Sequence, residues 1–128
     1  MMECSFKKTY DLKKRQLESS RIREKYTNKI PIIVTKDDKC TLGQISKSKY
    51  LVPEDITLGQ FSLIIRKRIE LRESDALFFF INGSTIPPIS NSMVSLYEDY
   101  KDDDGFLYMT YCGENVFGNS FMNSFIHK

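Results

Sequence analysis

Apolar positions recur along the chain in patterns that predict three helices and four strands. The polar segment from Asp11 to Tyr26 carries only sparse apolar residues, which is typical of a helix lying on a protein surface. Ile30 to Val34 is a β-branched run that predicts a buried strand, with Pro31 near its start or on its unpaired side. Tyr50 to Val52 predicts a short strand that Pro53 ends, and this strand is a candidate sheet edge.

The second half of the chain continues the alternation of helices and strands. Thr57 to Gln60 has the spacing of a capping box and precedes an apolar stripe, so a helix is expected there. The aromatic run from Ala76 to Ile81 predicts a strand that enters the Asn82-Gly83 turn. Met93 to Tyr100 predicts a short helix capped by a serine, and Phe106 to Tyr111 predicts the last strand.

The order of these elements indicates the fold class. It reads helix, strand, strand, helix, strand, helix, strand, which favours an α+β fold with one mixed four-stranded sheet over regular βαβ winding. A β-grasp sheet wrapped on the helix at 57–69, with the first helix added outside, accommodates this order. A chain of 128 residues that is 41% hydrophobic is expected to form one compact domain.

Charge and cysteine content indicate which partners and which cellular compartment suit the protein. Residues 1–30 carry nine basic and four acidic residues, a net charge of +5 within a total of +2. A solvated helix surface explains such a basic face about as well as a surface for acidic peptides, lipid headgroups, tubulin tails or nucleic acid. The three cysteines are widely separated, so a reducing compartment is expected, without a disulfide frame or zinc site. No apolar run reaches the roughly 20 residues that span a bilayer.

Residues suited to catalysis are scarce. The only histidine is His127, near the end of the sequence, and nothing beside Cys112 suggests an activated thiolate. The acidic run from Asp102 to Gly105 lacks the glycine and glutamate spacing of a calcium loop and predicts a turn. We therefore expect no enzyme activity, no metal and no cofactor. Aromatic residues are not interleaved with the basic ones as in nucleic-acid interfaces, so no nucleic-acid partner is expected.

Seven short blocks stand out between Phe6 and Gly118. They are Lys29-Ile30-Pro31-Ile32-Ile33, Lys49-Tyr50-Leu51-Val52-Pro53, Gly59-Gln60-Phe61, Ile65-Arg66-Lys67-Arg68-Ile69, Asp104-Gly105-Phe106-Leu107-Tyr108, Gly113-Glu114-Asn115 and Phe117-Gly118. Several such blocks in one order are hard to obtain by chance. Together they resemble the autophagy-related protein 8 family of ubiquitin-like modifiers, which includes the GABA-receptor-associated proteins and microtubule-associated light chain 3.

This resemblance implies processing at a glycine. A cysteine protease would recognise Phe117 and cut between Gly118 and Asn119; activating and conjugating enzymes would then pass the Gly118 carboxylate to phosphatidylethanolamine. Glycine suits this role because it has no Cβ to hinder a narrow tunnel or attack at its carbonyl. The implied organisation is a helical extension, a ubiquitin-like core, a flexible arm and a tail removed by processing, at 1–28, 29–112, 113–118 and 119–128. The tail is long for the family, and it could slow the protease or contact the fold before its removal.

The resemblance also implies docking of cargo receptors that carry an aromatic-x-x-aliphatic motif, along the strand edge at 50–52. The aromatic pocket would comprise Glu18, Ile22, Pro31, Ile33, Lys49, Leu51 and Phe106. The aliphatic pocket would comprise Tyr50, Val52, Pro53, Phe61, Ile64 and Arg68. Phe78 and Phe80 match a surface that the family uses in conjugation, although burial in the sheet explains an aromatic strand equally well.

Two functions follow from these expectations. The first is a modifier that moves from the cytoplasm to autophagosomal and related vesicle membranes once it carries lipid. The alternative is an unconjugated binding module of the same fold that engages tubulin or trafficking proteins through its basic helix. The sequence leaves open which receptors bind and which organelle is decorated.

Overall fold

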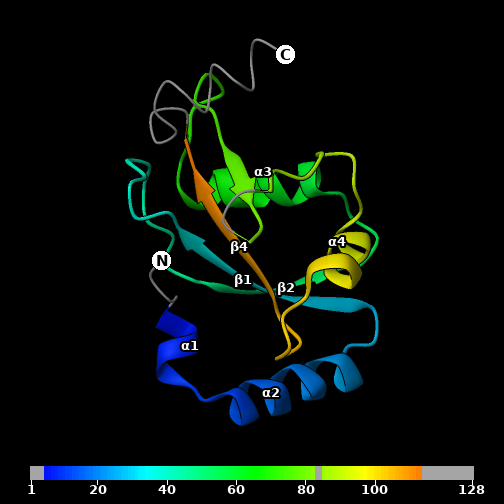
Figure 1. Ribbon diagram of the computed structural model, residues 1–128. Helices are drawn as coiled ribbons and strands as arrows, with labels where there is room; N and C mark the ends of the chain where they lie inside the picture. The colour runs from blue at the N-terminus through cyan, green and yellow to red at the C-terminus, as the bar shows by residue number, and fades with distance from the viewer. Residues whose placement is uncertain (1–4, 83–84, 114–128) are drawn as a thin grey trace.

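The computed structural model describes residues 5–82 and 85–113 (Figure 1). Its elements in chain order are α1 (Ser5–Thr9), α2 (Leu12–Lys25), β1 (Lys29–Lys36), β2 (Lys49–Pro53), α3 (Leu58–Arg68), β3 (Phe78–Phe80), α4 (Met93–Tyr100) and β4 (Leu107–Cys112). The three predicted helices and four predicted strands are all present, and α1 is an addition.

One mixed sheet forms the centre of the molecule. Its strand order is β2-β1-β4-β3, with β1 and β4 parallel and the two outer pairs antiparallel. The α+β expectation, with one mixed four-stranded sheet and an N-terminal helical segment, is therefore confirmed. In Figure 1 the sheet lies between α2 on one side and α3 on the other.

Side-chain caps define where the helices begin. The Asp11 carboxylate accepts the Lys14 N–H at 2.9 Å and starts α2. Thr57 and Gln60 form the predicted capping box at the start of α3, with each side chain accepting the other residue's main-chain N–H. Ser92 caps α4. These caps satisfy main-chain donors that the first turn of a helix leaves without partners.

The main core fills the face of the sheet that carries α3. Phe61 and Ile65 of α3 pack there against alternating residues of β1 and β4, such as Ile32 and Met109. Alternation sends the residues between them to the opposite face. Strand β3, Phe78–Phe80, is shorter than the predicted run from Ala76 to Ile81. At its end, Ile81 pairs with Thr85 across a turn rather than with β4.

Helix α1 was not predicted, because five residues rich in lysine show no apolar period. Tertiary contacts hold it in place instead. The Phe6 ring packs edge-on against Phe106 with ring centroids 5.1 Å apart. Lys7 Nζ donates to Asp102 at 2.8 Å and lies over the Tyr108 ring. Burial disfavours ionisation of Asp102, but hydrogen bonds from Lys7 and the Asp104 N–H, with nearby positive charge, outweigh it and lower the pKa of this carboxyl.

A buried carboxylate, Asp104, fastens α2 to the loop before β4. Its side chain is fully buried and accepts Arg15 Nε at 2.9 Å, the Phe106 N–H at 2.8 Å and the Tyr108 hydroxyl. The Ser19 hydroxyl donates to the Asp104 carbonyl in the same place. A carboxylate with this many donors is stable away from water, because hydrogen bonds replace its hydration.

Gly105 allows α2 and this loop to approach so closely. Its φ of +87° is a conformation that residues with side chains rarely adopt. A Cβ at this position would lie only 2.3 Å from Ser19 Oγ. The acidic turn predicted at 102–105 is thus confirmed, and α2 packs against it.

A second, small apolar cluster lies at the end of β4, on the face opposite the main core. It contains Cys40, Phe80 and Cys112, all buried. Burial, with a smaller contribution from the nearby Asp37 and Cys40, raises the pKa of the Cys112 thiol to about 12. The thiol is therefore neutral at physiological pH, which agrees with the expectation of a small buried residue rather than a nucleophile.

The Asp104 site predicts a large loss of stability for one conservative change. Asp104→Asn keeps the shape but removes the charge that pairs with the nearly buried Arg15, so the free energy of unfolding should fall by about 3 kcal/mol. Urea denaturation measures this. Asp103→Asn, at an exposed neighbouring position, is the control and should change stability by less than about 0.5 kcal/mol. Equal stability of the two variants would contradict the assignment.

The Cys112 environment predicts poor thiol reactivity in the folded protein. At about pH 8 almost none of a thiol with this raised pKa is thiolate, so iodoacetamide should leave Cys112 unmodified. The same reagent in urea should modify it, because unfolding restores water and an ordinary pKa. Peptide mass spectrometry after alkylation measures both states, and rapid modification of the native protein would refute the burial argument.

Candidate functional site

Strand β2 lies at one end of the sheet order, as predicted for a sheet edge. The Val34 N–H donates to the Ser48 carbonyl at 2.8 Å. In an antiparallel pair, every second residue of a strand forms hydrogen bonds to the neighbouring strand. Counting from Ser48, the main-chain groups of Tyr50 and Val52 therefore face β1.

The residues between them, Lys49 and Leu51, consequently direct their main-chain groups outward from the sheet. These groups form a row of donors and acceptors that an added strand can pair with. Leu51 as a residue is also 37% exposed, whereas Leu107, the leucine of β4, is fully buried. The edge therefore combines outward main-chain groups with exposed apolar surface.

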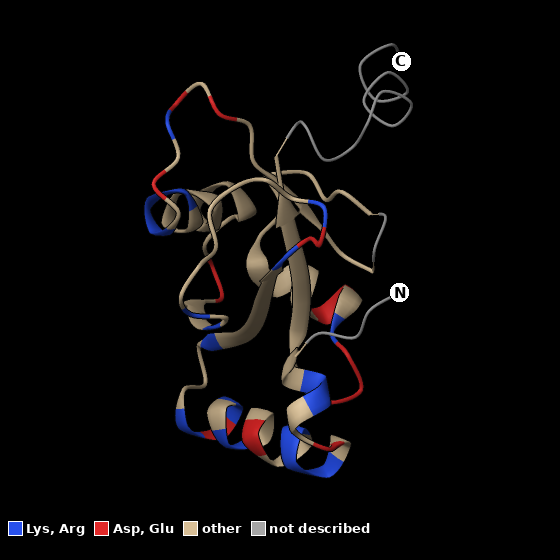
Figure 2. Cartoon of the chain, turned by 90° about the vertical axis from the view of Figure 1, so that its left-hand side faces the viewer, with Lys and Arg blue, Asp and Glu red and all other residues tan. Residues whose placement is uncertain are grey.

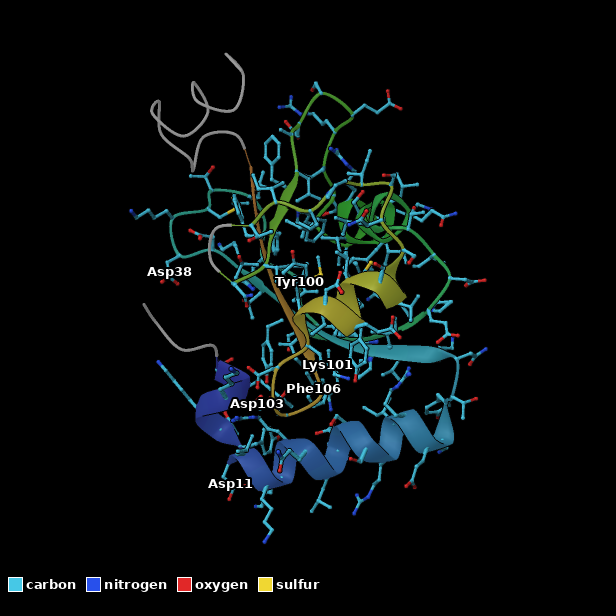
Figure 3. The ribbon with its side chains drawn as sticks, turned by 45° about the vertical axis from the view of Figure 1, so that its right-hand side comes forward. Asp11, Asp38, Tyr100, Lys101, Asp103 and Phe106 are labelled. Carbon is cyan, nitrogen blue, oxygen red and sulfur yellow. The ribbon has the colours of Figure 1, made fainter. Side chains whose placement is uncertain are left out.

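The predicted aromatic-pocket residues gather on the α2 face of this edge. Pro31 pairs with Leu51 and Ile33 with Lys49, so the side chains of both pairs share one face of the sheet. Pro31, Ile33 and Phe106 are buried and form a floor, and Figure 3 shows Phe106 between the N-terminal helices and the sheet.

Charged residues border this floor. Glu18 of α2 forms an ion pair with Lys49 of β2, so the two side chains join the helix to the edge strand. Ile22, one turn further along α2, is half-buried. All seven residues of the predicted set thus lie on α2, β1, β2 or the start of β4, around the same end of the sheet.

Phe6 is a site residue that the sequence did not reveal. Its ring contacts Phe106, and Lys49 Nζ lies 5.8 Å from its ring centroid. An open cavity of about 300 Å³ adjoins it, lined by Ser5, Phe6, Thr9, Tyr10, Ser48 and Lys49. The only signal in the sequence was a lone aromatic residue in a charged segment.

Five of the six predicted aliphatic-pocket residues lie on the opposite face, beside α3. Tyr50, Val52 and Phe61 belong to the buried core, with the Tyr50 and Phe61 rings edge-on at 5.9 Å. Ile64 is 38% exposed and Arg68 is exposed, so these two α3 residues form the accessible rim. The half-buried Pro53 alternates with Val52 along β2 and therefore shares the face of Leu51. Three residues of the predicted set are thus floor and two are rim.

Positive charge lies above the Tyr50 ring. The Arg68 guanidinium is 5.9 Å and Lys47 Nζ is 5.2 Å from the ring centroid. Burial raises the pKa of Tyr50, which the charge of Arg68 partly opposes. Among the described residues, the buried Tyr50 hydroxyl has no hydrogen-bond partner. The rim of the aliphatic set is thus basic, whereas the ion pair of Glu18 with Lys49 balances the charge beside the aromatic set.

Phe78 and Phe80 lie on β3, next to the point where the chain leaves the sheet. Phe78 pairs with Cys112, the last residue of β4, and both phenylalanines pack against the small cysteine cluster. Phe78 is half-buried and Phe80 is buried. The predicted cleavage residues Phe117, Gly118 and Asn119 lie outside the described residues.

The outer surface of α2 is strongly basic (Figure 2). Lys13, Lys14, Arg21 and Lys25 are all exposed on it. In the part of the chain that is described, none of the helices has both the length and the apolar character needed to cross a bilayer.

Comparison with known proteins identifies the family. The family model described as "Autophagy protein Atg8 ubiquitin like" matches residues 14–118. Autophagy-related protein 8A of Oryza sativa subsp. indica is 52% identical over 94% of this chain and 100% of its own length. Autophagy-related protein 8c of Arabidopsis thaliana is 51% identical over 92% of this chain and 98% of its own.

Solved structures agree with the sequence relatives. Trypanosoma brucei ATG8 has a TM-score of 0.85 and 39% identity, over 91% of this chain and 100% of that one. Plasmodium falciparum Atg8, solved with a Plasmodium falciparum Atg3 peptide, has a TM-score of 0.77 and 31% identity, over 88% and 100%. The expected ubiquitin-like fold is thereby confirmed, and the chain belongs to the Atg8 family of ubiquitin-like autophagy proteins.

Proposed function

We propose that this protein is a lipid-conjugated modifier of autophagy that recruits receptors to autophagosomal membranes. The observation that carries the proposal is the β2 edge, whose outward main-chain groups lie between two side-chain clusters on opposite faces of the sheet. Membership of the Atg8 family supports the same reading.

The geometry of an extended peptide fits this edge. Residues three positions apart in a strand point to opposite faces, so an aromatic-x-x-aliphatic motif presents one anchor to each face. The aromatic anchor enters beside Lys49 and Leu51 on the α2 face, and the aliphatic anchor enters beside Ile64 and Arg68 on the α3 face. The basic rim of the aliphatic set, with Lys47 and Arg68 over Tyr50, favours motifs flanked by acidic residues.

Conjugation starts with hydrolysis of the amide between Gly118 and Asn119. Water supplies the oxygen of the new Gly118 carboxylate, and the leaving group is the amine of Asn119. The activating enzyme uses ATP to convert the carboxylate to a thioester on its own cysteine, and the conjugating enzyme receives it on another. The amine of phosphatidylethanolamine then displaces the thiolate and forms an amide, so the partners supply the catalysis and this chain supplies the acyl group.

Two features of the chain support contact with these enzymes. The related Plasmodium Atg8 was solved with an Atg3 peptide, which supports a conjugating-enzyme partner for this family member. Phe78 and Phe80 lie on β3 beside the end of β4, which is six residues before Gly118 in the sequence. The half-buried Phe78 offers the accessible part of this expected conjugation surface, and Phe80 lies buried behind it.

Lipid attachment changes where the protein resides. The two acyl chains of phosphatidylethanolamine give lasting membrane attachment, whereas a single chain gives only marginal binding. The unconjugated form is cytoplasmic and the conjugated form is on autophagosomes and related vesicles. The protein is not an enzyme in this scheme and needs no cofactor.

The basic surface of α2 favours a second candidate, an unconjugated module that binds acidic partners such as tubulin tails. Lys13, Lys14, Arg21 and Lys25 would contact the acidic segment. The intact mass of the protein recovered from cells separates the two candidates. A form that ends at Gly118 and carries phospholipid supports the modifier, whereas recovery of only the full chain through Lys128 supports the module.

Substitution of the reacting glycine tests the conjugation step. Gly118→Ala places a methyl group at the bond to be cut, so processing should fall by at least about tenfold and the protein should stay diffuse in the cytosol. Intact mass spectrometry and fluorescence microscopy measure the two effects. Asn119→Ala is the matched control and should be processed normally. Membrane puncta of the Gly118→Ala protein would refute the assignment.

Substitution at the exposed edge tests the docking step. Leu51→Ala removes apolar surface that a bound motif covers, so the affinity for an aromatic-x-x-aliphatic peptide should fall about tenfold. Isothermal titration calorimetry measures the Kd. Leu63→Ala is the control, because Leu63 is 59% exposed on α3 but lies outside both predicted sets. Equal affinities for the two variants would exclude this edge as the docking site.

A further inference from the structure

Two exposed aliphatic side chains, one on α3 and one in the loop before α4, have no role in the proposed function. Leu63 of α3 is 59% exposed. Ile89 is 71% exposed, more than any other large apolar residue in the described part of the chain. A single exposed leucine or isoleucine is ordinary on a protein surface, so these two matter only if they are neighbours and fit one partner.

Gly59 brings Ile89 against the first turn of α3. The Gly59 N–H donates to the Ile89 carbonyl and the Leu58 N–H donates to the Asn91 carbonyl, both at 2.9 Å. A Cβ on Gly59 would lie 3.6 Å from the Ile89 Cβ. Leu63 is one turn further along the helix, and helical side chains lean toward the preceding turn, so Leu63 leans toward Gly59. Leu63 and Ile89 are therefore neighbours, and we call them the α3 patch.

The α3 patch is separate from the surfaces described above. Phe61 and Ile65 turn one side of α3 into the core, and Leu63 lies on the other side of the helix. Ile64 of the predicted aliphatic set follows Leu63 and so points about 100° around the helix from it. Figure 1 shows α3 on the side of the sheet opposite α2 and its basic surface. A partner on the α3 patch leaves the β2 edge and α2 free.

Opposite charges lie at the two ends of α3. Residues 58–69 carry three basic and no acidic residues, all three in the last turn, and residues 54–57 carry two acidic and no basic ones. Lys67 and Asp55 are exposed at these two ends. Glu70 has a φ of +55° and ends the helix, so the acidic residues after it leave the helix axis. None of the ion pairs within the described residues includes Lys67 or Asp55.

We propose that the α3 patch is a contact between two copies of this chain, with their α3 helices antiparallel. Leu63 is the middle residue of the eleven in α3, so a twofold axis there places Leu63 of one copy on Leu63 of the other. The same axis brings the Lys67 end of each helix beside Ile89 and Asp55 of the other copy.

The occupant is a second copy because the surface is complementary to itself. Its centre is apolar, and its ends carry charges that the antiparallel arrangement pairs with their opposites. An anionic bilayer or an acidic peptide would match Lys67 but would place a like charge against Asp55. The surface also protrudes at Ile89, whereas peptide recognition usually uses a groove or pocket.

The contact is small, and its consequence rests on the proposed function. Two aliphatic side chains from each copy bury less area than a stable dimer needs, so the free protein is mostly monomeric. Copies attached to one membrane share a surface instead of a volume, and the higher effective concentration favours the contact. Each pair then presents two β2 edges, so a receptor with two motifs binds more tightly than a receptor with one.

Nuclear magnetic resonance of the full chain tests the contact without protease or lipid. The resonances of Leu63 and Lys67 should move as the protein concentration rises from micromolar to millimolar. Ile89→Asp puts a charge in the apolar centre, so the Kd of self-association should rise at least about tenfold. Ser95→Asp adds the same charge at an exposed position of α4 and is the matched control, with the wild-type Kd expected.

Three results would contradict the contact. Resonances that stay fixed up to millimolar protein would exclude it. A wild-type Kd for Ile89→Asp would assign self-association to another face. Resonances of the α3 patch that move only when vesicles of phosphatidylcholine and phosphatidylserine are added would assign the patch to a bilayer.

An exchange of charges tests the antiparallel arrangement. Lys67→Asp and Asp55→Lys each place like charges together at two symmetry-related positions, so each should raise the Kd at least about fivefold. The two changes in one chain should restore it, because every end again meets its opposite. A double variant as weak as the single ones would rule out this arrangement.

The failure of this inference is distinct from that of the proposed function. Cellular protein that ends at Gly118 and carries phospholipid, but whose α3 patch shows no self-association, removes the contact alone. Self-association of a chain that cells never process removes the modifier alone.

Discussion

The buried ion pair between Arg15 and Asp104 is the contact on which the arrangement of the predicted aromatic set depends. It joins the N-terminal helices to the loop that leads into β4, two parts of the chain that are far apart in sequence. The Asp104 carboxylate also accepts hydrogen bonds from the Phe106 N–H and the Tyr108 hydroxyl, and these fix the position at which Arg15 holds α2. Without this ion pair, Glu18 and Phe6 would not contact Lys49 on β2. The predicted aromatic set would then keep its buried residues but lose the side chains that the N-terminal helices contribute.

The alternation of side chains along each strand then divides them between the two faces of the sheet. Each central strand sends one set of side chains to α3 and the other to the face that holds α2, so one sheet supports the core, the cysteine cluster and the two clusters proposed for docking. The same alternation explains why an edge strand can hold core residues and site residues in turn. Tyr50 and Val52 belong to the buried core, whereas Lys49 and Leu51 belong to the proposed docking edge.

The parts of the structure that the sequence predicted are those fixed by local chemistry. Capping side chains at Asp11, Thr57 and Ser92 define helix starts, and β-branched or aromatic runs define strands, because these preferences act over a few residues. Helix α1 and the role of Phe6 escaped prediction, since both arise from contacts with residues about a hundred positions away.

The two predicted pockets show the same limit. Sequence similarity indicated which residues gather at the edge, and the structure brings them together, but it could not divide floor from rim. Tyr50 and Phe61 are core residues, and Ile64 and Arg68 are the accessible ones. That division depends on burial, which is a property of the assembled fold. The assignments at Phe117, Gly118 and Asn119 stay predictions, since those residues lie outside the described ranges.

The parallel pairing of β1 with β4 has a consequence for biosynthesis. These neighbours are the first and last strands of the chain, so the sheet cannot close until nearly the whole domain has emerged from the ribosome. Until then the apolar sides of β1 and β2 lack the neighbour that covers them, and pairing over such a separation is intrinsically slow. A nascent chain of this kind depends on chaperones for longer than one whose adjacent strands pair as they appear.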